Sequence, residues 1–229
     1  MKEIQEKPQE AIHKILNEID ENIPNSSEFS NAELEYLEEF SFHHADDIRS
    51  RVAVILASFT EKRGEDILLR LAKDKDSLVR VEACDSLSNS KSFSTFEFLK
   101  GIIKEDRNGM VRGYAISSLN ELSTKLYKNP ETVRFLLEVL NSEAVEFSKI
   151  NIYKALYNMG EKQYLQYLLK GLNTSVYQNR CATVNLLEEI IDDENEKEIK
   201  EALEERIKVE KTKAVSSTII KVLKQIEDR

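Results

Sequence analysis

The sequence predicts an all-α protein built as an array of helix pairs, and three observations indicate this fold class. Six glycines and three prolines among 229 residues favour long helices joined by short turns. Apolar residues make up 41% of the chain and charged residues 33%, which is enough to bury a core beneath a charged surface. The third observation is an internal repeat of about 32 residues, a period typical of helical-repeat proteins.

Two stretches show the repeat most clearly. Segments 76–87 and 108–119 each contain Val-Arg, then Ala, then Leu at the same spacing. Apolar β-branched residues at the Val position recur 31, 32, 34, 31 and 33 residues apart. These anchors are Ile48, Val79, Val111, Val145, Val176 and Val209. Small or apolar residues follow each anchor by five positions, so each anchor is predicted to open a packed helix.

A second amphipathic segment lies between successive anchors, for example at 67–72 and 164–169, which makes two helices per repeat. Helix-start signals agree, since Pro130 suits a first helical position and Ser92 suits a cap. Residues 8–30 are predicted to form a capping helix near 8–21 and a turn at 23–27. Six helical repeats are predicted to fill 31–229, so the chain from 1 to 229 is predicted to be one domain.

The order Asp, Val-Arg, Ala and Leu resembles the HEAT-repeat family, including its short bacterial members of the PBS-lyase type. The resemblance covers about residues 31–227 and implies a right-handed α-α superhelix whose second helices line a concave face. The match weakens along the chain, because the Arg after the anchor becomes Glu146, Tyr177 and Glu210 in the last three repeats. Lys149, Arg180 and Lys213 stand there at the usual small-residue position. Family members bind many unrelated proteins, so the resemblance implies an architecture more than a function.

The resemblance places a partner-binding surface on the outward positions of the second helices. These are polar, mildly acidic and rich in Asn: Glu82, Asp85, Asn89, Tyr114, Ser117, Glu121, Asn151, Lys154, Asn158 and Asn179. A phosphate backbone would require several Lys or Arg there, so a protein or peptide partner is expected and nucleic acid is not. Tyr114 is the expected aromatic anchor.

The N-terminal part is strongly acidic. From Ile15 to Ile48 there are ten acidic residues and no Lys or Arg, with Glu33, Glu35, Glu38 and Glu39 at the centre of this run. One interpretation is the solvated face of a terminal capping repeat. The other is a docking surface for a basic partner, which the net charge of −9 also favours.

The sequence contains no set of residues typical of catalysis or metal binding. His43 and His44 are adjacent, so their side chains diverge on a helix and are not expected to share an ion. Cys84 and Cys181 are expected to be small, reduced core residues. The Arg series is expected to pack and pair near the helix starts, with Asp46, Asp76 and Asn108 as caps. We therefore expect no enzyme activity, no cofactor and no metal.

The leading functional hypothesis is a cytoplasmic, non-catalytic scaffold that binds a protein or peptide on its concave face. The alternative is an acidic immunity or inhibitor protein that neutralises a basic toxin such as a nuclease. A third hypothesis, less favoured than these two, is a lyase or a nucleic-acid-modifying enzyme built on the same repeat. No signal sequence or membrane span is expected, because the N-terminus lacks an apolar core and no run reaches about 18 apolar residues. The sequence leaves the oligomeric state open.

Overall fold

A computed structural model describes residues 8–22, 28–59 and 61–228, and their regular structure is helical throughout. The predicted N-terminal helix is confirmed, whereas the turn predicted at 23–27 lies outside the described residues. None of the described helices is long and apolar enough to cross a membrane. The helices are α2 (Gln9–Asn22), α3 (Asn31–Phe40), α4 (Asp46–Ile55), α5 (Lys62–Leu71), α6 (Ser77–Ser86), α7 (Phe93–Glu105), α8 (Gly109–Lys125), α9 (Asn129–Leu140), α10 (Glu146–Asn158), α11 (Tyr164–Lys170), α12 (Tyr177–Ile190), α13 (Glu196–Val209) and α14 (Lys213–Glu227).

After α2, the described helices form the six predicted pairs, in the manner of a HEAT-like solenoid. The first helices of the pairs are α3, α5, α7, α9, α11 and α13, and the second helices are α4, α6, α8, α10, α12 and α14. The chain divides into two compact units, Met1–Asn129 (unit 1) and Pro130–Arg229 (unit 2). That residues 1–229 form one domain stays a prediction.

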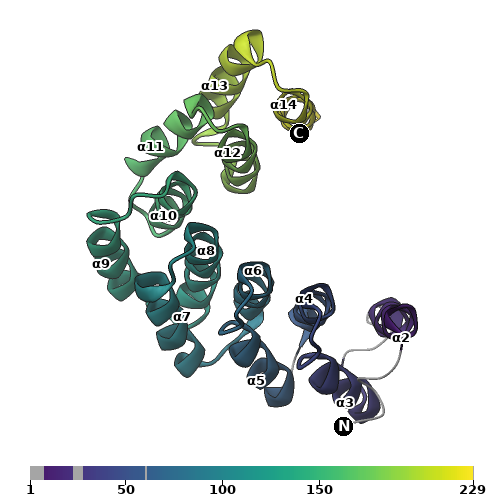
Figure 1. The fold of residues 1–229 in the computed structure, drawn as a ribbon. Coiled ribbons are helices and arrows are strands. Elements are labelled where there is room, and N and C mark those ends of the chain that lie inside the picture. Colours follow the sequence, from purple (N-terminus) through teal and green to yellow (C-terminus); the bar gives the residue numbers. More distant parts are fainter. Residues whose placement is uncertain (1–7, 23–27, 60, 229) are drawn as a thin grey trace. The chain divides into compact units, whose positions relative to one another are not determined.

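Unit 1 has two helical layers (Figure 1). Helices α3, α5 and α7 form one layer, and α2, α4, α6 and α8 form the other, in which neighbouring helices pack on each other. The side chains of Phe40, Ile48, Leu68 and Phe96 are almost fully buried between the layers. Burying such large apolar groups supplies most of the stability of a helix pair, since single short helices are marginal in water.

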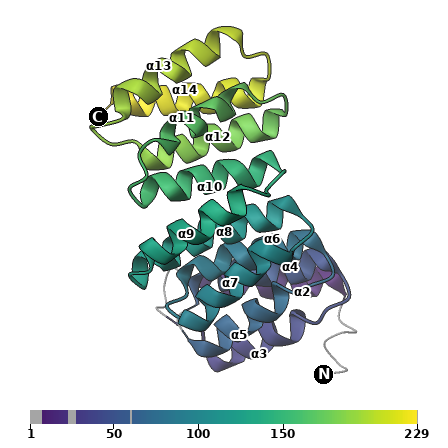
Figure 2. The same cartoon turned by 90° about the vertical axis from the view of Figure 1, so that its left-hand side faces the viewer.

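Unit 2 repeats this arrangement with α9, α11 and α13 in one layer and α10, α12 and α14 in the other (Figures 1 and 2). Leu168, Leu187, Leu203 and Ile219 are fully buried in its core. Gly171, which begins a 3₁₀ turn after α11, lies so close to α12 that an added Cβ atom would stand 2.4 Å from the Thr183 hydroxyl. A larger residue would fit there only if the Thr183 side chain shifted.

An arginine in the first turn of several second helices joins one repeat to the next, and we call this arrangement the arginine fork. In the first fork, Arg49 Nε and Nη2 donate to the Asp74 carboxylate at 2.7 and 2.8 Å. Its Nη1 donates to the carbonyls of His43 and His44 just before its own helix. Arg80 repeats this arrangement with the carboxylate of Asp106, at 2.7 and 3.0 Å.

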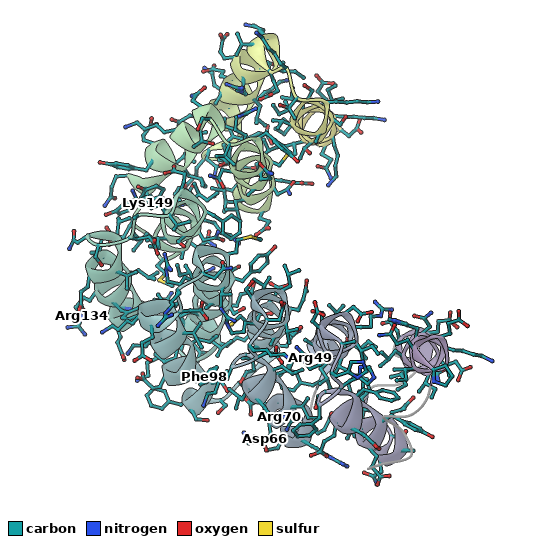
Figure 3. All side chains as sticks on the ribbon, viewed as in Figure 1. Arg49, Asp66, Arg70, Phe98, Arg134 and Lys149 are labelled. Atoms are coloured by element: carbon teal, nitrogen blue, oxygen red, sulfur yellow. The ribbon has the colours of Figure 1, made fainter. Side chains whose placement is uncertain are left out.

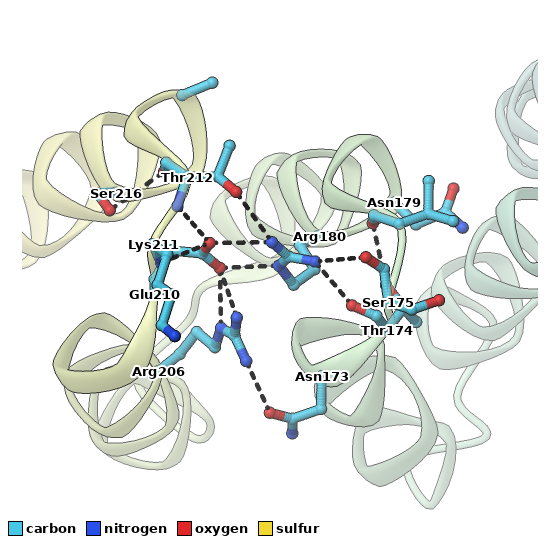
Figure 4. Close-up of polar contacts among 12 residues, drawn as sticks. Asn173, Thr174, Ser175, Asn179, Arg180, Arg206, Glu210, Lys211, Thr212 and Ser216 are labelled. Atoms are coloured by element: carbon cyan, nitrogen blue, oxygen red, sulfur yellow. Dashed lines mark hydrogen bonds and ion pairs between the residues drawn. The ribbon is translucent and has the colours of Figure 1, made fainter.

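The fork recurs in unit 2 around Arg180 (Figure 4). Arg180 Nε and Nη2 donate to Glu210 at 2.8 and 2.9 Å, and Nη1 donates to the carbonyls of Thr174 and Ser175. Arg206 also donates to the same Glu210 carboxylate. The side chains of Arg180 and Glu210 are 9% and 1% exposed, so these guanidinium groups serve packing and are not displayed for a ligand.

The expected structural role of the Arg series is therefore confirmed, but its partners differ from those expected. Asp76 and Asn108 cap their own helices by accepting hydrogen bonds from backbone N–H groups. The forks use carboxylates two residues before the cap of the following second helix, namely Asp74 and Asp106. Asp46 lies in the first turn of α4 and is not the cap.

The predicted anchor register is correct in the first three repeats and wrong in the last three. Ile48, Val79 and Val111 are fully buried. Val145 and Val176 precede α10 and α12 as N-caps, and Val209 ends α13; they are 39%, 48% and 62% exposed. Arg180 is the fourth residue of α12, as Arg80 is of α6, so in α12 it occupies the fork position.

Candidate functional site

The second helices of unit 1 carry a continuous stripe of surface residues that we call the α6–α8 face. On each of the two helices the residues follow one another by four, three and four positions, which keeps them on one side. The α6–α8 face consists of Leu78, Glu82, Asp85 and Asn89 from α6 and the turn after it, and Met110, Tyr114, Ser117 and Glu121 from α8.

All six residues predicted for binding in this part of the chain reach the surface. Asp85, Asn89 and Glu121 are exposed, and Glu82, Tyr114 and Ser117 are half-buried. The prediction missed the two apolar members of the stripe, Leu78 and Met110, which are 57% and 45% exposed. The sequence could have identified them, because each is an apolar residue four positions before a predicted binding residue, Glu82 or Tyr114. Each also lies in the first turn of a capped helix, where side chains are exposed.

Side chains of α6 and α8 form hydrogen bonds to the preceding second helix. Ser86 Oγ donates to the carbonyl of Ala53 at 2.9 Å, and Ser118 Oγ donates to that of Cys84 at 2.7 Å. Both serines are buried, so these bonds are shielded from water. Lys125 Nζ adds a bond to the Ser88 carbonyl at 2.6 Å. The α6–α8 face therefore rests on helices held at a defined separation.

The α6–α8 face is electrostatically negative. Partial burial raises the pKa of Glu82, and the neighbouring Asp85 carboxylate raises it further. The pKa of Tyr114 is raised by burial, by Asp85 and by Glu82, which places the phenol beside both carboxylates. Among the described residues, neither Glu82 nor Glu121 takes part in an ion pair. These groups favour a cation delivered by a partner.

In the fourth repeat the structure corrects two of the predicted binding residues. Asn151 and Lys154 were predicted to face outward, but each is only 5% exposed. Asn151 Nδ2 donates to the Phe147 carbonyl of its own helix at 2.8 Å, and Lys154 Nζ pairs with Glu189. Asn179 is half-buried because it is the third residue of α12, a place that core residues occupy in α4, α6 and α8. Asn158 is exposed as predicted.

Two ion pairs join neighbouring second helices of unit 2. Lys154 of α10 pairs with Glu189 of α12, and Glu188 of α12 pairs with Lys221 of α14 at 3.0 Å. These two pairs bring opposite charges of neighbouring second helices together.

Some residues of the acidic N-terminal run form contacts that stabilise the fold. Glu33 and Ser30 form a reciprocal capping box at the start of α3, with the Ser30 backbone N–H donating to the Glu33 carboxylate at 2.7 Å. Glu38 pairs with Arg63 of α5 at 2.5 Å. Of the four acidic residues predicted as a docking patch, Glu35 is exposed, whereas the other three are half-buried: Glu33, Glu38 and Glu39.

The remaining titratable groups lie in structural positions. His43 is buried, and its Nδ1 accepts a hydrogen bond from the Ala45 backbone at 3.2 Å; burial lowers its pKa. Burial raises the pKa of the Cys84 thiol to about 12, which suppresses the reactive thiolate. Cys181 is only partly buried, contrary to the expected core position. Within the described ranges, no three His, Cys, Asp or Glu side chains gather to hold a metal ion.

Residues 35–120 match the family described as HEAT repeats. This part of the chain consists of HEAT repeats. Among solved structures, the complex of CpcE and CpcF of phycocyanin lyase from Nostoc sp. PCC7120 is similar at 14% identity and a TM-score of 0.54, covering 86% of this chain and 83% of that chain.

Human deoxyhypusine hydroxylase in complex with glycerol is 15% identical at a TM-score of 0.49, covering 98% of this chain and 93% of that chain. An engineered protein is 16% identical at a TM-score of 0.43, covering 85% and 96%. At such identities the likeness shows the fold alone. No curated protein matches the sequence.

Proposed function

We propose that this protein is a non-catalytic scaffold that binds a basic segment of a partner protein on the α6–α8 face. The observation that carries the proposal is the combination of Glu82, Asp85 and Glu121 with the exposed side chains of Leu78 and Met110 on two adjacent helices. We also propose that the protein is cytoplasmic, as predicted from the sequence.

The chemistry of the face favours an amphipathic partner. Leu78 offers apolar contact one turn before Glu82, and Met110 offers it one turn before Tyr114, which lies beside the carboxylates of Asp85 and Glu82. Apolar and aromatic groups supply most of the binding energy at protein interfaces, whereas charges chiefly steer and select the partner. A segment that alternates Leu or Phe with Lys or Arg satisfies both parts of the face.

The test uses fluorescein-labelled synthetic peptides of this composition, with binding to the full chain followed by fluorescence polarisation. We expect the double variant Glu82→Gln/Glu121→Gln to weaken binding about tenfold at low salt, and the difference to shrink at high salt. Leu78→Ser should weaken binding at both salt concentrations, because apolar contact is not screened.

The matched control is Glu201→Gln/Glu204→Gln on α13, which removes the same charge from two exposed positions in unit 2. Its affinity should stay within about twofold of wild type. If basic peptides do not bind, or if both double variants weaken binding equally, the α6–α8 face is not the binding site.

The inhibitor hypothesis receives less support, because Glu33 and Glu38 are engaged in a helix cap and an ion pair. It predicts instead that Glu35→Gln weakens the binding of a basic nuclease while Glu82→Gln does not. The proposal also predicts no turnover; a reproducible reaction abolished by Asp85→Asn or Glu121→Gln would favour the enzyme hypothesis.

A further inference from the structure

The fork arrangement is incomplete between the fourth and fifth repeats, in unit 2. A fork arginine is the fourth residue of its second helix, and in α10 this residue is Lys149, which Figure 3 shows on that helix. The fork carboxylate stands two residues before the N-cap of the following second helix. Before Val176, the N-cap of α12, this residue is Thr174. The fork here keeps a cation, but threonine replaces the carboxylate.

The turn that contains Thr174 packs against the part of α10 that contains Lys149. An added Cβ atom at Gly171, where this turn begins, would stand 3.2 Å from Cγ2 of Ile150, the residue after Lys149. The backbone N–H and the hydroxyl of Thr174 both donate to the Gly171 carbonyl, at 3.3 and 3.1 Å. The hydroxyl therefore serves its own turn and does not replace a carboxylate.

Two donors that the other forks satisfy have no acceptor here. Within the described residues, the half-buried Lys149 side chain forms neither a hydrogen bond nor an ion pair, and the backbone N–H of Val176 has no acceptor. In four other repeats the N–H at this position donates to the carboxylate two residues before it at 2.8 Å: the N–H groups of Asp76, Asn108, Val145 and Thr212. A carboxylate at the place of Thr174 would satisfy both donors.

A second lysine occupies the position of another fork residue. In the complete fork of Figure 4, Arg206 stands four residues before Glu210 and donates to its carboxylate at 3.0 and 2.6 Å. Lys170 stands four residues before Thr174 and is exposed. Its Nζ lies 4.9 Å from the centre of the Tyr167 ring, and it has no carboxylate partner in the described part of the chain.

The chain around Thr174 contains no acidic residue. Residues 164–180 include two charged side chains, and both are basic. They are Lys170 and Arg180, and Arg180 is neutralised within its own fork. Together with Lys149, this part of unit 2 therefore has two lysines that no carboxylate of the described chain neutralises. Such an excess of positive charge favours an anionic group.

Two acidic side chains adjoin the lysines, but neither pairs with them. Glu205 lines a groove of about 290 Å³ together with Lys170, and it pairs with a lysine of its own helix at 2.6 Å. Glu146 stands three residues before Lys149 and forms no ion pair with it. Burial raises the pKa of Tyr153 and the charge of Glu146 raises it further, which places this carboxylate beside the phenol.

We propose that the incomplete fork binds an Asp or Glu side chain of a partner protein. The carboxylate takes the place that Glu210 has in the complete fork. Lys149 and Lys170 flank it, and the backbone N–H of Val176 donates to it, so that its hydrogen bonds are charge-assisted. The side chains of Val176 and Tyr177 are 48% and 44% exposed beside the site and offer contact to the rest of the segment.

The test uses unlabelled peptides of about 12 residues with one central Glu among Leu and Ser, and matched peptides in which Gln replaces this Glu. In calorimetric titrations of the full chain we expect the Glu peptide to bind about tenfold more tightly than the Gln peptide. In nuclear magnetic resonance spectra the Glu peptide should move the amide proton of Val176 downfield, because that N–H gains a charged acceptor.

The double variant Lys149→Ala/Lys170→Ala should weaken binding of the Glu peptide about tenfold and leave the Gln peptide unchanged. The matched control is Lys213→Ala/Lys224→Ala, which removes the same charge from two exposed positions on α14. Its affinity for the Glu peptide should stay within about twofold of wild type. Circular dichroism checks that each variant keeps the helical content of wild type.

Thr174→Glu supplies the carboxylate from within the chain. This variant should melt about 2–4 °C above wild type, because the new side chain completes the fork, and it should bind the Glu peptide about tenfold more weakly. Since it gains stability, its loss of binding cannot result from unfolding. Thr174→Gln, which has the same size without the charge, should not raise the melting temperature.

This site selects the charge opposite to that selected by the α6–α8 face. Glu82→Gln/Glu121→Gln should therefore leave the Glu peptide unchanged, so failure of this proposal and failure of the proposed function are distinguishable. The proposal is overturned if the Glu and Gln peptides bind equally, or if Lys149→Ala/Lys170→Ala binds the Glu peptide as wild type does. It is also overturned if inorganic phosphate at the same concentration moves the Val176 amide equally, since the site would then take a free anion.

Discussion

In each arginine fork, one arginine side chain binds both the backbone before its own helix and a carboxylate of the next repeat. Nη1 of Arg80 donates to the carbonyl of Asp74 just before α6. Nε and Nη2 of the same side chain donate to the Asp106 carboxylate, which belongs to the next repeat. Asp106 in turn accepts the backbone N–H of Asn108, the cap of α8. The fork therefore links the start of one second helix to the start of the next.

We predict that Arg180→Ala destabilises the protein by about 3 kcal/mol, because the Glu210 carboxylate would stay buried with Arg206 as its main remaining partner. The free energy of unfolding from urea titration at pH 7 measures this. Lys197→Ala is the control, since the ion pair of Lys197 with Glu201 is exposed and its loss should cost about 0.5 kcal/mol or less.

Arg180→Ala should also change how the free energy of unfolding depends on pH. The hydrogen bond from Arg180 is the largest cause that lowers the pKa of Glu210, and the Thr212 N–H and Arg206 add to it against the opposing effect of burial. Since the folded pKa lies below the unfolded value of about 4.3, this stabilisation is present above that pH and is lost as the pH falls. Wild type should lose stability below about pH 5 more steeply than Arg180→Ala; equal slopes would contradict this origin.

At the scale of elements, two glycines in helical segments have opposite surroundings. An added methyl group at Gly171 would stand 2.4 Å from Thr183, whose hydroxyl already donates to the Asn179 carbonyl, whereas the same group at Gly101 would enter open space. We predict that Gly171→Ala destabilises by about 1–3 kcal/mol and that Gly101→Ala stabilises by about 0.5–1 kcal/mol. Thermal unfolding followed by circular dichroism compares them, and melting shifts of the same sign would refute the assignment.

Helix pairs could be predicted from the sequence because apolar periodicity and scarce glycine and proline report directly on helices. The register of α10 and α12 could not be read from β-branched anchors, because Val145 and Val176 suit the extended backbone of an N-cap as well as a core position. A better signal was an acidic residue six positions before a basic one, as in Asp74 with Arg80 and Glu143 with Lys149. It would have placed the fourth repeat correctly.

The part of the candidate site on α6 and α8 was predictable because the register was correct there. Helical geometry placed Glu82, Tyr114 and Glu121 on the surface, and the structure agrees. The burial of Lys154 depends on Glu189, a residue of another repeat, and such a pairing cannot be read from the periodicity of one helix.

At the scale of the whole molecule, the chain is held together by neighbour-to-neighbour contacts, so a local defect should weaken nearby repeats most. Ala83 is fully buried in α6, and Ala83→Asp would place a charge without a partner in the core of unit 1 at a cost of about 3 kcal/mol or more. In hydrogen-exchange mass spectrometry we expect loss of protection in α4, α6 and α8, and the smallest loss in α14. Ser94→Asp, which adds the same charge at an exposed position in the first turn of α7, should leave protection unchanged. An equal loss in α6 and α14 would instead mean that the chain unfolds as one cooperative block, which is the behaviour of a single domain spanning 1–229.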